Sequence, residues 1–499
     1  MNQQNDAFTP ALFAALADAG DRVVIEIGQR VLSGHELAKA VERWAAALAA
    51  VGIVQGDRIA VQAEKSLELV LLYLATLRLG AVYLPLNTGY RRDEIAYFIA
   101  DAEPRLLICD PSAAEACAGL GPIVLTLSSD GSGTIADRVT QGHPPAPPHI
   151  PQGSDLAAIV YTSGTTGRPK GAMISQHNLL ANARALIAGW GLCAQDVLLH
   201  ALPLYHIHGL FVALNTLLLA GGRIVLLPAF DTAAVFDRLA GATVFMGVPT
   251  YYTRLLADPA LNVQSAQNVR LFVCGSAPLN VATFADFELR TGHRILERYG
   301  MSECGIICSN PLNGLRIPGA VGRPVPGCRV RIADGLALGV LEVAGDSVFA
   351  GYWRNPEKTR QEFRDDGYFI TGDIARIDGD GVVWIVGRDK DMIISGGLNV
   401  YPKEIEVLID ALDGVEESAV IGLPHDDFGE AVAAVVCLRD GAEFTAEAII
   451  AALRGQLAGF KLPKAVFVVD ELPRNAMGKV QKVELRKRHS DYFGTSGLA

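Results

Sequence analysis

The chain has 499 residues, of which 50% are hydrophobic and 19% charged, and its formal net charge is -11 at pH 7. This length favours a large domain with a smaller one over a single simple core. The negative charge argues against non-specific nucleic-acid binding as the main role. The eight cysteines include no C-x-x-C pair, so we expect reduced, mostly buried thiols rather than a zinc site.

The N-terminus has neither the basic start nor the apolar core of a secretory signal. The longest apolar region, 198–219, is interrupted by three histidines and an asparagine, which favours a buried core over a membrane span. We therefore expect a cytoplasmic protein without a transmembrane segment.

Helix-like and strand-like segments alternate through the first 150 residues. Ser66–Gly80 has helical spacing and ends at a glycine, and the strand-like 81–86 follows it, so the two predict one α/β unit. The proline-rich stretch 144–153 predicts an extended connector inside the large domain.

The run Y-T-S-G-T-T-G-R-P-K-G, at 161–171, has the composition of a loop that wraps a polyphosphate. Glycines allow close backbone approach, hydroxyls and amides donate to phosphate oxygens, and Lys170 supplies charge. An apolar segment precedes the run and a helix-like one follows, so we expect the loop between a strand and a helix. It is not the common P-loop, because Arg168 and Pro169 precede the lysine. The alternative is a flexible surface linker.

Three buried-strand candidates, at 223–228, 243–249 and 269–275, are separated by helical segments and predict a largely parallel sheet. After Gly319, short strands punctuated by glycine predict a small antiparallel or barrel-like subdomain. The charged run at 388–391 predicts a domain boundary, and two helices and three strands follow it.

The predicted fold class is therefore α/β. A large N-terminal domain (1–387) has parallel-rich sheets with helices and a small β-barrel-like subdomain, a hinge spans 388–391, and a small mobile α+β domain covers 392–499.

Two later motifs could complete a nucleotide site. In E-R-Y-G-M-S-E, Tyr299 offers a flat face for adenine, Gly300 a tight turn and Glu303 a hard oxygen ligand for Mg²⁺. In T-G-D, Asp373 ends a probable strand and can accept from both ribose hydroxyls. Taken alone, either motif is also compatible with an ordinary surface turn.

In this order and spacing, the motifs from Tyr161 to Lys482 resemble the adenylate-forming superfamily, which includes acyl-CoA synthetases, luciferases and peptide-synthetase adenylation domains. The resemblance implies Lys479 as the catalytic lysine, Glu303 and Thr166 as catalytic residues and Mg²⁺ ligands, and Lys390 as the hinge. It implies a coenzyme A channel at Ser395, Gly396 and Gly397. The implied ATP-binding residues are Thr162, Ser163, Gly164, Thr165, Thr166, Gly167, Lys170, Ser276, Ala277, Pro278, Tyr299, Gly300, Met301, Ser302, Asp373, Arg388 and Lys479. Ser302 stands where threonine is commoner and keeps the hydroxyl.

The implied reaction has two steps. A carboxylate attacks the α-phosphate of MgATP to give an acyl-adenylate and pyrophosphate, and the thiol of coenzyme A then displaces AMP. The C-terminal domain is expected to rotate between the steps and to withdraw Lys479.

Acetylation of Lys479 by an acetyltransferase would remove its charge and silence the enzyme. Lys482, close by, is expected to be a surface residue.

Arg298 bears on the identity of the acid, because a buried arginine is costly unless it meets an anion. A second carboxylate on the substrate would supply that anion. His206, Ser276 and Arg316 are further candidate substrate contacts, and His208 is expected to be a core histidine. The alternative for Arg298 is a structural ion pair with a neighbour such as Glu297 or Glu288.

The segments at 202–211, 247–256, 296–301 and 394–404 are similar to malonyl-CoA synthetases. The predicted acid is therefore malonate, with methylmalonate also considered. The alternative enzyme is a CoA ligase for another small, medium-chain or aryl acid. An amino-acid adenylation domain is disfavoured because no carrier module follows, and a nucleotide-binding regulator without catalysis is disfavoured by Lys479, Glu303 and Asp373.

Overall fold

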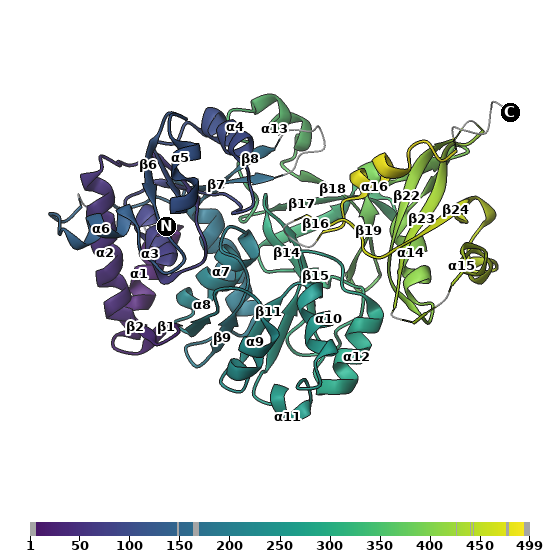
Figure 1. The fold of residues 1–499 in the computed structure, drawn as a ribbon, viewed down its shortest axis with the longest axis horizontal. Helices are drawn as coiled ribbons and strands as arrows, with labels where there is room; N and C mark the ends of the chain where they lie inside the picture. Colours follow the sequence, from purple (N-terminus) through teal and green to yellow (C-terminus); the bar gives the residue numbers. More distant parts are fainter. Residues whose placement is uncertain are drawn as a thin grey trace.

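The computed structural model of the chain describes residues 6–146, 149–162, 169–425, 427–439, 441–442, 444–475 and 479–493. Across these ranges the strands form four sheets, three in the N-terminal part and one in the C-terminal part. Figure 1 shows the C-terminal sheet, in yellow-green, at the right-hand end of the molecule.

The first sheet consists of β1 (Val23–Ile27), β2 (Arg30–Ser33), β9 (Val197–His200), β10 (Arg223–Leu226), β11 (Val244–Gly247), β12 (Leu271–Cys274), β13 (Leu296–Met301), β14 (Gly305–Ser309) and β15 (Arg323–Pro324). Its order is β15-β14-β13-β12-β11-β9-β10-β1-β2. The strands from β13 to β1 pair in parallel, as their near-continuous apolar sequences predict.

The second sheet consists of β3 (Arg58–Gln62), β4 (Val82–Pro85), β5 (Leu106–Cys109), β6 (Ile123–Thr126), β7 (Leu156–Thr162) and β8 (Lys170–Ser175). Its order is β6-β5-β3-β4-β7-β8, and all pairs are parallel except β7 with β8.

Two further sheets follow in the sequence. The third is antiparallel and consists of β16 (Cys328–Ile332), β17 (Leu338–Gly345), β18 (Phe369–Ile377) and β19 (Val383–Arg388). The C-terminal sheet consists of β20 (Ile393–Ser395), β21 (Leu398–Val400), β22 (Val415–His425), β23 (Gly429–Leu438) and β24 (Ala465–Val469).

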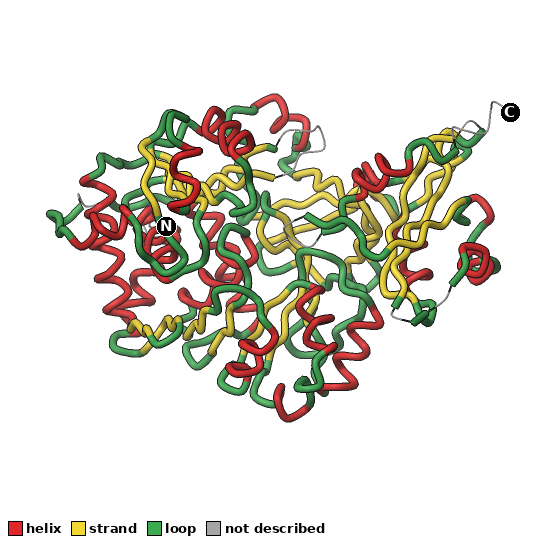
Figure 2. Tube along the Cα trace, viewed as in Figure 1, coloured by secondary structure: helices red, strands yellow, loops and turns green. Residues whose placement is uncertain are grey.

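Helices surround the N-terminal sheets, as the red segments of Figure 2 show. They are α1 (Phe8–Ala19), α2 (Gly34–Ala50), α3 (Leu67–Arg78), α4 (Arg92–Ala102), α5 (Ala114–Cys117), α6 (Thr134–Thr140), α7 (Gln176–Trp190), the π-helix η3 (His208–Asn215), α8 (Thr216–Leu219), α9 (Thr232–Leu239), α10 (Pro249–Ala257), α11 (Val263–Ala266), α12 (Val281–Thr291) and α13 (Pro356–Glu362). The C-terminal part adds α14 (Pro402–Asp410), α15 (Ala446–Leu453) and α16 (Lys482–His489). Short 3₁₀ turns are η2 (Pro111–Ala113), η4 (Ala333–Gly335), η5 (Asp389–Asp391) and η6 (Gly459–Lys461). No helix within the described ranges is long and apolar enough to cross a membrane.

The helix predicted at Ser66–Gly80 and the strand after it are confirmed as α3 and β4. The Ser66 hydroxyl accepts from the Leu69 N–H at 3.1 Å, which caps the helix start. Gly80 has a φ of 68°, a conformation that glycine adopts without strain, and it ends the helix.

The C-terminal sheet buries both of its faces, which explains the continuous apolar sequence of β23. Val432 packs in a cluster with Ile405 of α14, whereas the next residue, Ala433, packs in a second cluster with Leu485 of α16. Because successive strand residues point to opposite faces, both clusters draw on the same strand.

Three local predictions are wrong. The predicted phosphate loop joins two antiparallel strands, β7 and β8, because 170–175 pairs with β7 before α7 begins. Asp373 lies inside β18 rather than at its end, opposite Arg388 in β19. Gly300 lies within β13, where the register shifts and a Cβ would lie 2.8 Å from Ile306 Cα, so its role is close packing rather than a turn.

Candidate active site

The candidate site lies along the carboxyl ends of the central strands of the first sheet. The chain leaves β9 towards β10 on one side and then crosses to β11 on the other, and ligands bind open sheets at such a reversal. Residues 201–208 follow β9, and Ser276, Ala277 and Pro278 follow β12. Tyr299, Gly300 and Met301 end β13, and Ser302 opens the next turn.

Arg298 is the most unusual group in this region. It is buried in β13 with only 6% of its surface exposed, and its Nε and Nη2 have no hydrogen-bond partner among the described residues. Burial lowers the pKa of its guanidinium to about 10, against the opposing effect of nearby Cys274 and Tyr252. Arg298 is therefore still a cation at neutral pH, and a buried cation of this kind is unfavourable until an anion binds it.

Neither acidic neighbour supplies that anion. The Glu297 carboxylate accepts from the Gly319 N–H at 3.0 Å, and Glu288 pairs with Arg294 at 3.4 Å. Successive residues of a strand face opposite ways, which explains why Glu297 does not reach Arg298. The alternative of a structural ion pair at Arg298 therefore has no support in the geometry.

Gly275 makes room for the guanidinium. A Cβ at this position would lie 2.6 Å from Arg298 Nε, which is too close for a real side chain. The backbone of Gly275 does not have a left-handed φ, so glycine is needed here for space and not for conformation.

His206 presents a hydrogen-bond donor to the same region. Its Nδ1 accepts from the Ile207 N–H at 2.9 Å. Burial, then the Lys479 and Arg298 cations, lower the pKa of His206 to about 3, so the imidazole is neutral. Its proton therefore sits on Nε2, which is buried and has no partner among the described residues.

His208 and Ser276 lie against each other. The Ser276 hydroxyl is 3.2 Å from His208 Nδ1, and Ser276 has a φ of 71°, a strained conformation for a serine. Burial, followed by the Arg298 charge, lowers the pKa of His208 well below its usual value. His208 is buried, as expected of a core histidine, but it also contacts a predicted site residue.

Glu303 occupies the turn between β13 and β14 and accepts from two hydroxyl groups. Thr162 Oγ1 lies 3.1 Å and the Tyr352 hydroxyl 3.3 Å from the same carboxylate oxygen. Burial raises the pKa of Glu303, helped by the Glu362 carboxylate and opposed by these hydrogen bonds. No lysine or arginine among the described residues forms an ion pair with it, so a hard cation such as Mg²⁺ fits this carboxylate.

Lys170 is tied to the same group of residues. Its ammonium pairs with Glu362 at 3.1 Å, and the Tyr352 hydroxyl donates to Glu362 at 2.5 Å. Contacts therefore run from Thr162 through Glu303, Tyr352 and Glu362 to Lys170, and they join the two sides of the predicted phosphate loop. Ser163, Gly164, Thr165, Thr166 and Gly167 lie outside the described residues.

Helix α4 also holds both sides of that loop, through residues that the sequence did not single out. The Tyr161 hydroxyl donates to Asp101 at 2.5 Å, and the Tyr97 hydroxyl donates to the Pro169 carbonyl at 2.8 Å. Nothing in the local sequence marks these partners, because each pair joins segments 60 residues or more apart.

The predicted ribose ligands lie together. Asp373 is buried, pairs with Arg388 Nε at 2.7 Å and accepts a hydrogen bond from the Tyr299 hydroxyl. Its backbone N–H donates to the Thr371 hydroxyl at 3.1 Å. The structure thus brings the aromatic ring, the carboxylate and the guanidinium to one place.

Lys479 belongs to the C-terminal part but is subject to the charges of the N-terminal site. The Lys479 side chain is exposed to solvent. The protein atoms around it and the Arg388 cation nevertheless lower its pKa to about 8, while Asp373 and Glu303 act in the opposite direction. The charges of Arg388, Asp373, Glu303 and Arg298 all act on this pKa, which is consistent with a lysine near the ribose and metal positions.

The predicted hinge and coenzyme A residues lie on the C-terminal side. Lys390 is exposed in the short turn η5. Gly396 and Gly397, with φ of 58° and 77°, form the tight turn between β20 and β21, a conformation that favours glycine. Ser395 is buried and pairs with Gly429 of the same sheet. Among the described residues, no hydrogen bond or ion pair joins this turn to Arg298.

Two residues lie differently from expectation. Arg316 donates to the carbonyl oxygens of Pro311, Leu312 and Arg294, so three of its five N–H donors already have backbone partners. Lys482 is not a surface residue: it pairs with buried Glu406 at 2.5 Å. Both side chains therefore hold the fold locally.

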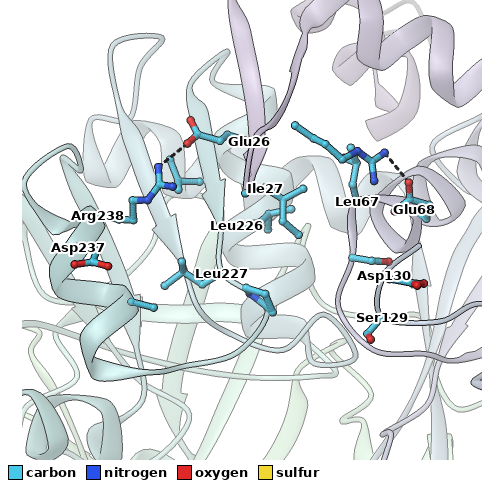
Figure 3. Close-up of a pocket in the computed structure, with 16 residues that line it drawn as sticks. Glu26, Ile27, Leu67, Glu68, Ser129, Asp130, Leu226, Leu227, Asp237 and Arg238 are labelled. Carbon is cyan, nitrogen blue, oxygen red and sulfur yellow. Dashed lines mark hydrogen bonds and ion pairs between the residues drawn. The ribbon is translucent and has the colours of Figure 1, made fainter. Parts of the chain in front are cut away.

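A groove of about 440 Å³ lies elsewhere, at the ends of β1 and β10 (Figure 3). Its charged side chains pair with each other, Arg238 with Glu26 at 2.9 Å and Arg30 with Glu68 at 2.6 Å. None of the predicted site residues lines this groove, which is therefore separate from the candidate active site.

Comparison with known proteins gives consistent matches along the chain. The model of the AMP-binding enzyme family matches residues 12–353, and that of the AMP-binding enzyme C-terminal domain matches 404–479. The structure of ATP-bound MatB from Rhodopseudomonas palustris aligns with a TM-score of 0.93 and 50% identity, over 97% of this chain and 99% of that one.

Curated relatives include enzymes for different acids. The mitochondrial malonate-CoA ligase ACSF3 of Mus musculus is 34% identical, over 97% of this chain and 91% of the relative. The feruloyl-CoA synthase of an Amycolatopsis species is 36% identical, over 92% of this chain and 94% of the relative. The predicted superfamily and fold class are thereby confirmed: the chain belongs to the AMP-binding enzyme family, the adenylate-forming enzymes.

Proposed function

We propose that the protein ligates malonate to coenzyme A through a malonyl-adenylate, consuming ATP and releasing AMP and pyrophosphate. The observation that carries this proposal is the buried guanidinium of Arg298, whose Nε and Nη2 have no partner among the described residues, directly before Tyr299 in β13. The malonate-CoA ligase relatives support it. Methylmalonate, which carries the same two carboxylates, is proposed as a second acid.

The second candidate is a CoA ligase for another small, medium-chain or aryl acid. The feruloyl-CoA synthase relative favours it. Such an acid offers one carboxylate, which the adenylation step consumes, so it would leave Arg298 without an anion. For this reason we place the dicarboxylate first.

In the proposed first step, one carboxylate of malonate attacks the α-phosphate of ATP. Arg298 holds the other carboxylate, and the His206 Nε2–H donates to it. Lys479 lies near the reacting groups and neutralises the negative charge that develops on the carboxylate and the phosphate. Tyr299 lies against adenine, and Asp373 and Arg388 hold the ribose hydroxyls.

Magnesium fits the site, because Glu303 is a buried carboxylate with hydroxyl partners only. Glu303 and Thr166 would hold the ion, which neutralises charge on the phosphates when bound. Tyr352 and Thr162 orient the Glu303 carboxylate through their hydrogen bonds.

In the proposed second step the C-terminal domain (392–499) rotates about Lys390, and the Ser395–Gly397 turn reaches the thiol of coenzyme A. Ile394 and Leu398, which flank this turn, are about half exposed, at 51% and 48%. Exposed apolar groups at a moving turn are consistent with a surface that the second orientation covers. The cytoplasmic location stays a prediction.

Adenylation should depend on pH through Lys479. The pKa of this lysine is lowered to about 8, so its charged form is present below that pH and is lost as the pH rises through it. We expect kcat/KM for ATP to fall about tenfold per pH unit above the pKa. A pH profile of pyrophosphate exchange checks this, and a profile that stays flat to a pH of about 9.5 would refute it.

Gly275→Ala should impair the use of malonate by displacing Arg298. The new methyl group would overlap the guanidinium, while the backbone tolerates alanine. We expect KM for malonate to rise at least about tenfold, with KM for ATP within about twofold. Steady-state kinetics with each substrate varied in turn measure both; an unchanged KM for malonate would contradict the assigned role of Gly275.

Lys479 is also proposed as a target for an acetyltransferase, because it is accessible to solvent and its charge is needed for adenylation. Acetylation should then lower the adenylation rate. Mass spectrometry of the modified protein, read beside its pyrophosphate exchange, checks this. Full activity in protein acetylated at Lys479 would refute it.

The overall function is tested by ATP- and CoA-dependent release of AMP with malonate, methylmalonate, acetate, octanoate and benzoate. The proposal predicts that malonate has the highest kcat/KM. A preference for any monoacid would favour the second candidate, and absence of pyrophosphate exchange with every acid would indicate a nucleotide-binding protein without catalysis.

A further inference from the structure

The segment from His200 to Gly209 carries His206 and His208, and a buried lysine from another part of the chain, Lys65, forms hydrogen bonds with its first residues. Lys65 lies between β3 and α3, so it belongs to the second sheet and its helices, whereas His200 ends β9 of the first sheet. Lys65 is 6% exposed and belongs to none of the sequence motifs of the site.

The contacts of Lys65 use all three of its N–H groups. Its Nζ lies 2.8 Å from His200 Nδ1, 2.7 Å from the His200 carbonyl and 2.9 Å from the Leu202 carbonyl. An ammonium group has three donors and these are three acceptors, so the group is fully satisfied and its direction is fixed.

The His200 ring, held by Lys65, in turn fixes the other end of the segment at Gly209. Because its Nδ1 accepts from Lys65, the ring carries its proton on Nε2, which donates to the Gly209 carbonyl at 2.8 Å. Gly209 in turn lies close to Pro203, since a Cβ at 209 would be 2.9 Å from the Pro203 carbonyl carbon. The segment is therefore closed on itself and fixed at both ends.

Stability alone does not account for a lysine at this position. Burial lowers its pKa well below the usual value, and none of its three hydrogen-bond partners is a carboxylate. An apolar side chain of similar length would avoid the cost of desolvating the ammonium. What the lysine adds is a fixed position for the two carbonyl groups at the start of the segment.

We propose that Lys65 is a positioning residue for the acid site: with His200, it sets where His206 and His208 stand relative to Arg298 and thereby determines the affinity for malonate. This inference rests on the proposed function. Lys65 itself is assigned no contact with substrate or nucleotide, and it acts through the backbone of 200–209.

The experiment compares Lys65→Met with the unsubstituted protein. Methionine keeps the length of the side chain and removes the three donors. We expect KM for malonate to rise about tenfold or more, while KM for ATP stays within about twofold. Hydrogen exchange of the backbone amides at 204–209 should become faster, with the amides of β3 and α3 unchanged.

Two further variants make the result decisive. Lys482→Met removes a partly buried lysine, the partner of buried Glu406, and should leave KM for malonate unchanged. Lys65→Arg keeps the charge but cannot place three donors on this tight set of acceptors, so it should raise KM for malonate less than methionine does. If Lys65→Met does not fold, the Lys65→Arg protein tests the proposal in its place, through the same two measurements.

Equal changes in KM for malonate and ATP, or a folded Lys65→Met protein with normal KM for malonate and normal exchange at 204–209, would overturn the proposal. Its failure is distinguishable from failure of the proposed function. If the unsubstituted protein prefers a monoacid, the dicarboxylate assignment is wrong, yet the exchange result and KM for that monoacid still test the role of Lys65.

Discussion

Arg298→Ala should lower kcat/KM for malonate by about 100- to 1,000-fold, the effect expected when one partner of a buried charge pair is removed. Binding of ATP should be unchanged, because adenine and ribose are assigned to Tyr299, Asp373 and Arg388. Steady-state kinetics with malonate and acetate, together with ATP titration by calorimetry, measure the two effects separately.

Two controls accompany this variant. Arg294→Ala removes a nearby arginine that pairs with Glu288 at the surface, and it should leave all kinetic constants within about twofold, since exposed pairs contribute little. Arg298→Lys keeps the charge but not the bidentate geometry and should fall between alanine and the original residue. If Arg298→Ala loses activity equally with malonate and acetate, the arginine is structural.

Lys479→Ala should slow formation of the acyl-adenylate by about 10³-fold, as loss of a group that stabilises developing charge does. The second step should survive, because the lysine is proposed to leave the site before the thiol attacks. Pyrophosphate exchange measures the first step. Conversion of synthetic malonyl-adenylate to malonyl-CoA measures the second.

The matched control is Lys487→Ala, an exposed lysine of α16 close to the same turn in sequence. It should leave both half-reactions unchanged. A Lys479→Ala protein that loses both half-reactions equally would contradict the proposed division between the two orientations of the C-terminal domain.

The helices, the strands and the order of the site motifs could be predicted from the sequence, because each depends on a local pattern of residues. Apolar runs indicated β10, β11 and β12. Ser66 and Gly80, on either side of α3, marked the two ends of that helix. The sequence placed Arg298 beside Tyr299 and so identified the group that carries the proposal for the acid. The sequence could not exclude an ion pair between Arg298 and Glu297. The structure resolves this question, because the Glu297 side chain faces the opposite way and accepts from the Gly319 N–H.

The contacts that the sequence did not predict join distant segments. Lys170 meets Glu362 across 192 residues, and Lys65 meets His200 across 135. No local spacing signals such a pair, because the partners become neighbours only when the sheets pack together. Arg316 is a similar case: its basic side chain indicated an anion, and the fold supplies three backbone carbonyl groups as partners.

The most direct test of the central claim is the ratio of kcat/KM for malonate to that for its monomethyl ester. The two acids have the same reacting carboxylate and carbon chain, but the ester lacks the second negative charge that Arg298 is proposed to bind. We predict a ratio of about 100 or more. A ratio near one would contradict the assignment of Arg298 to a dicarboxylate substrate.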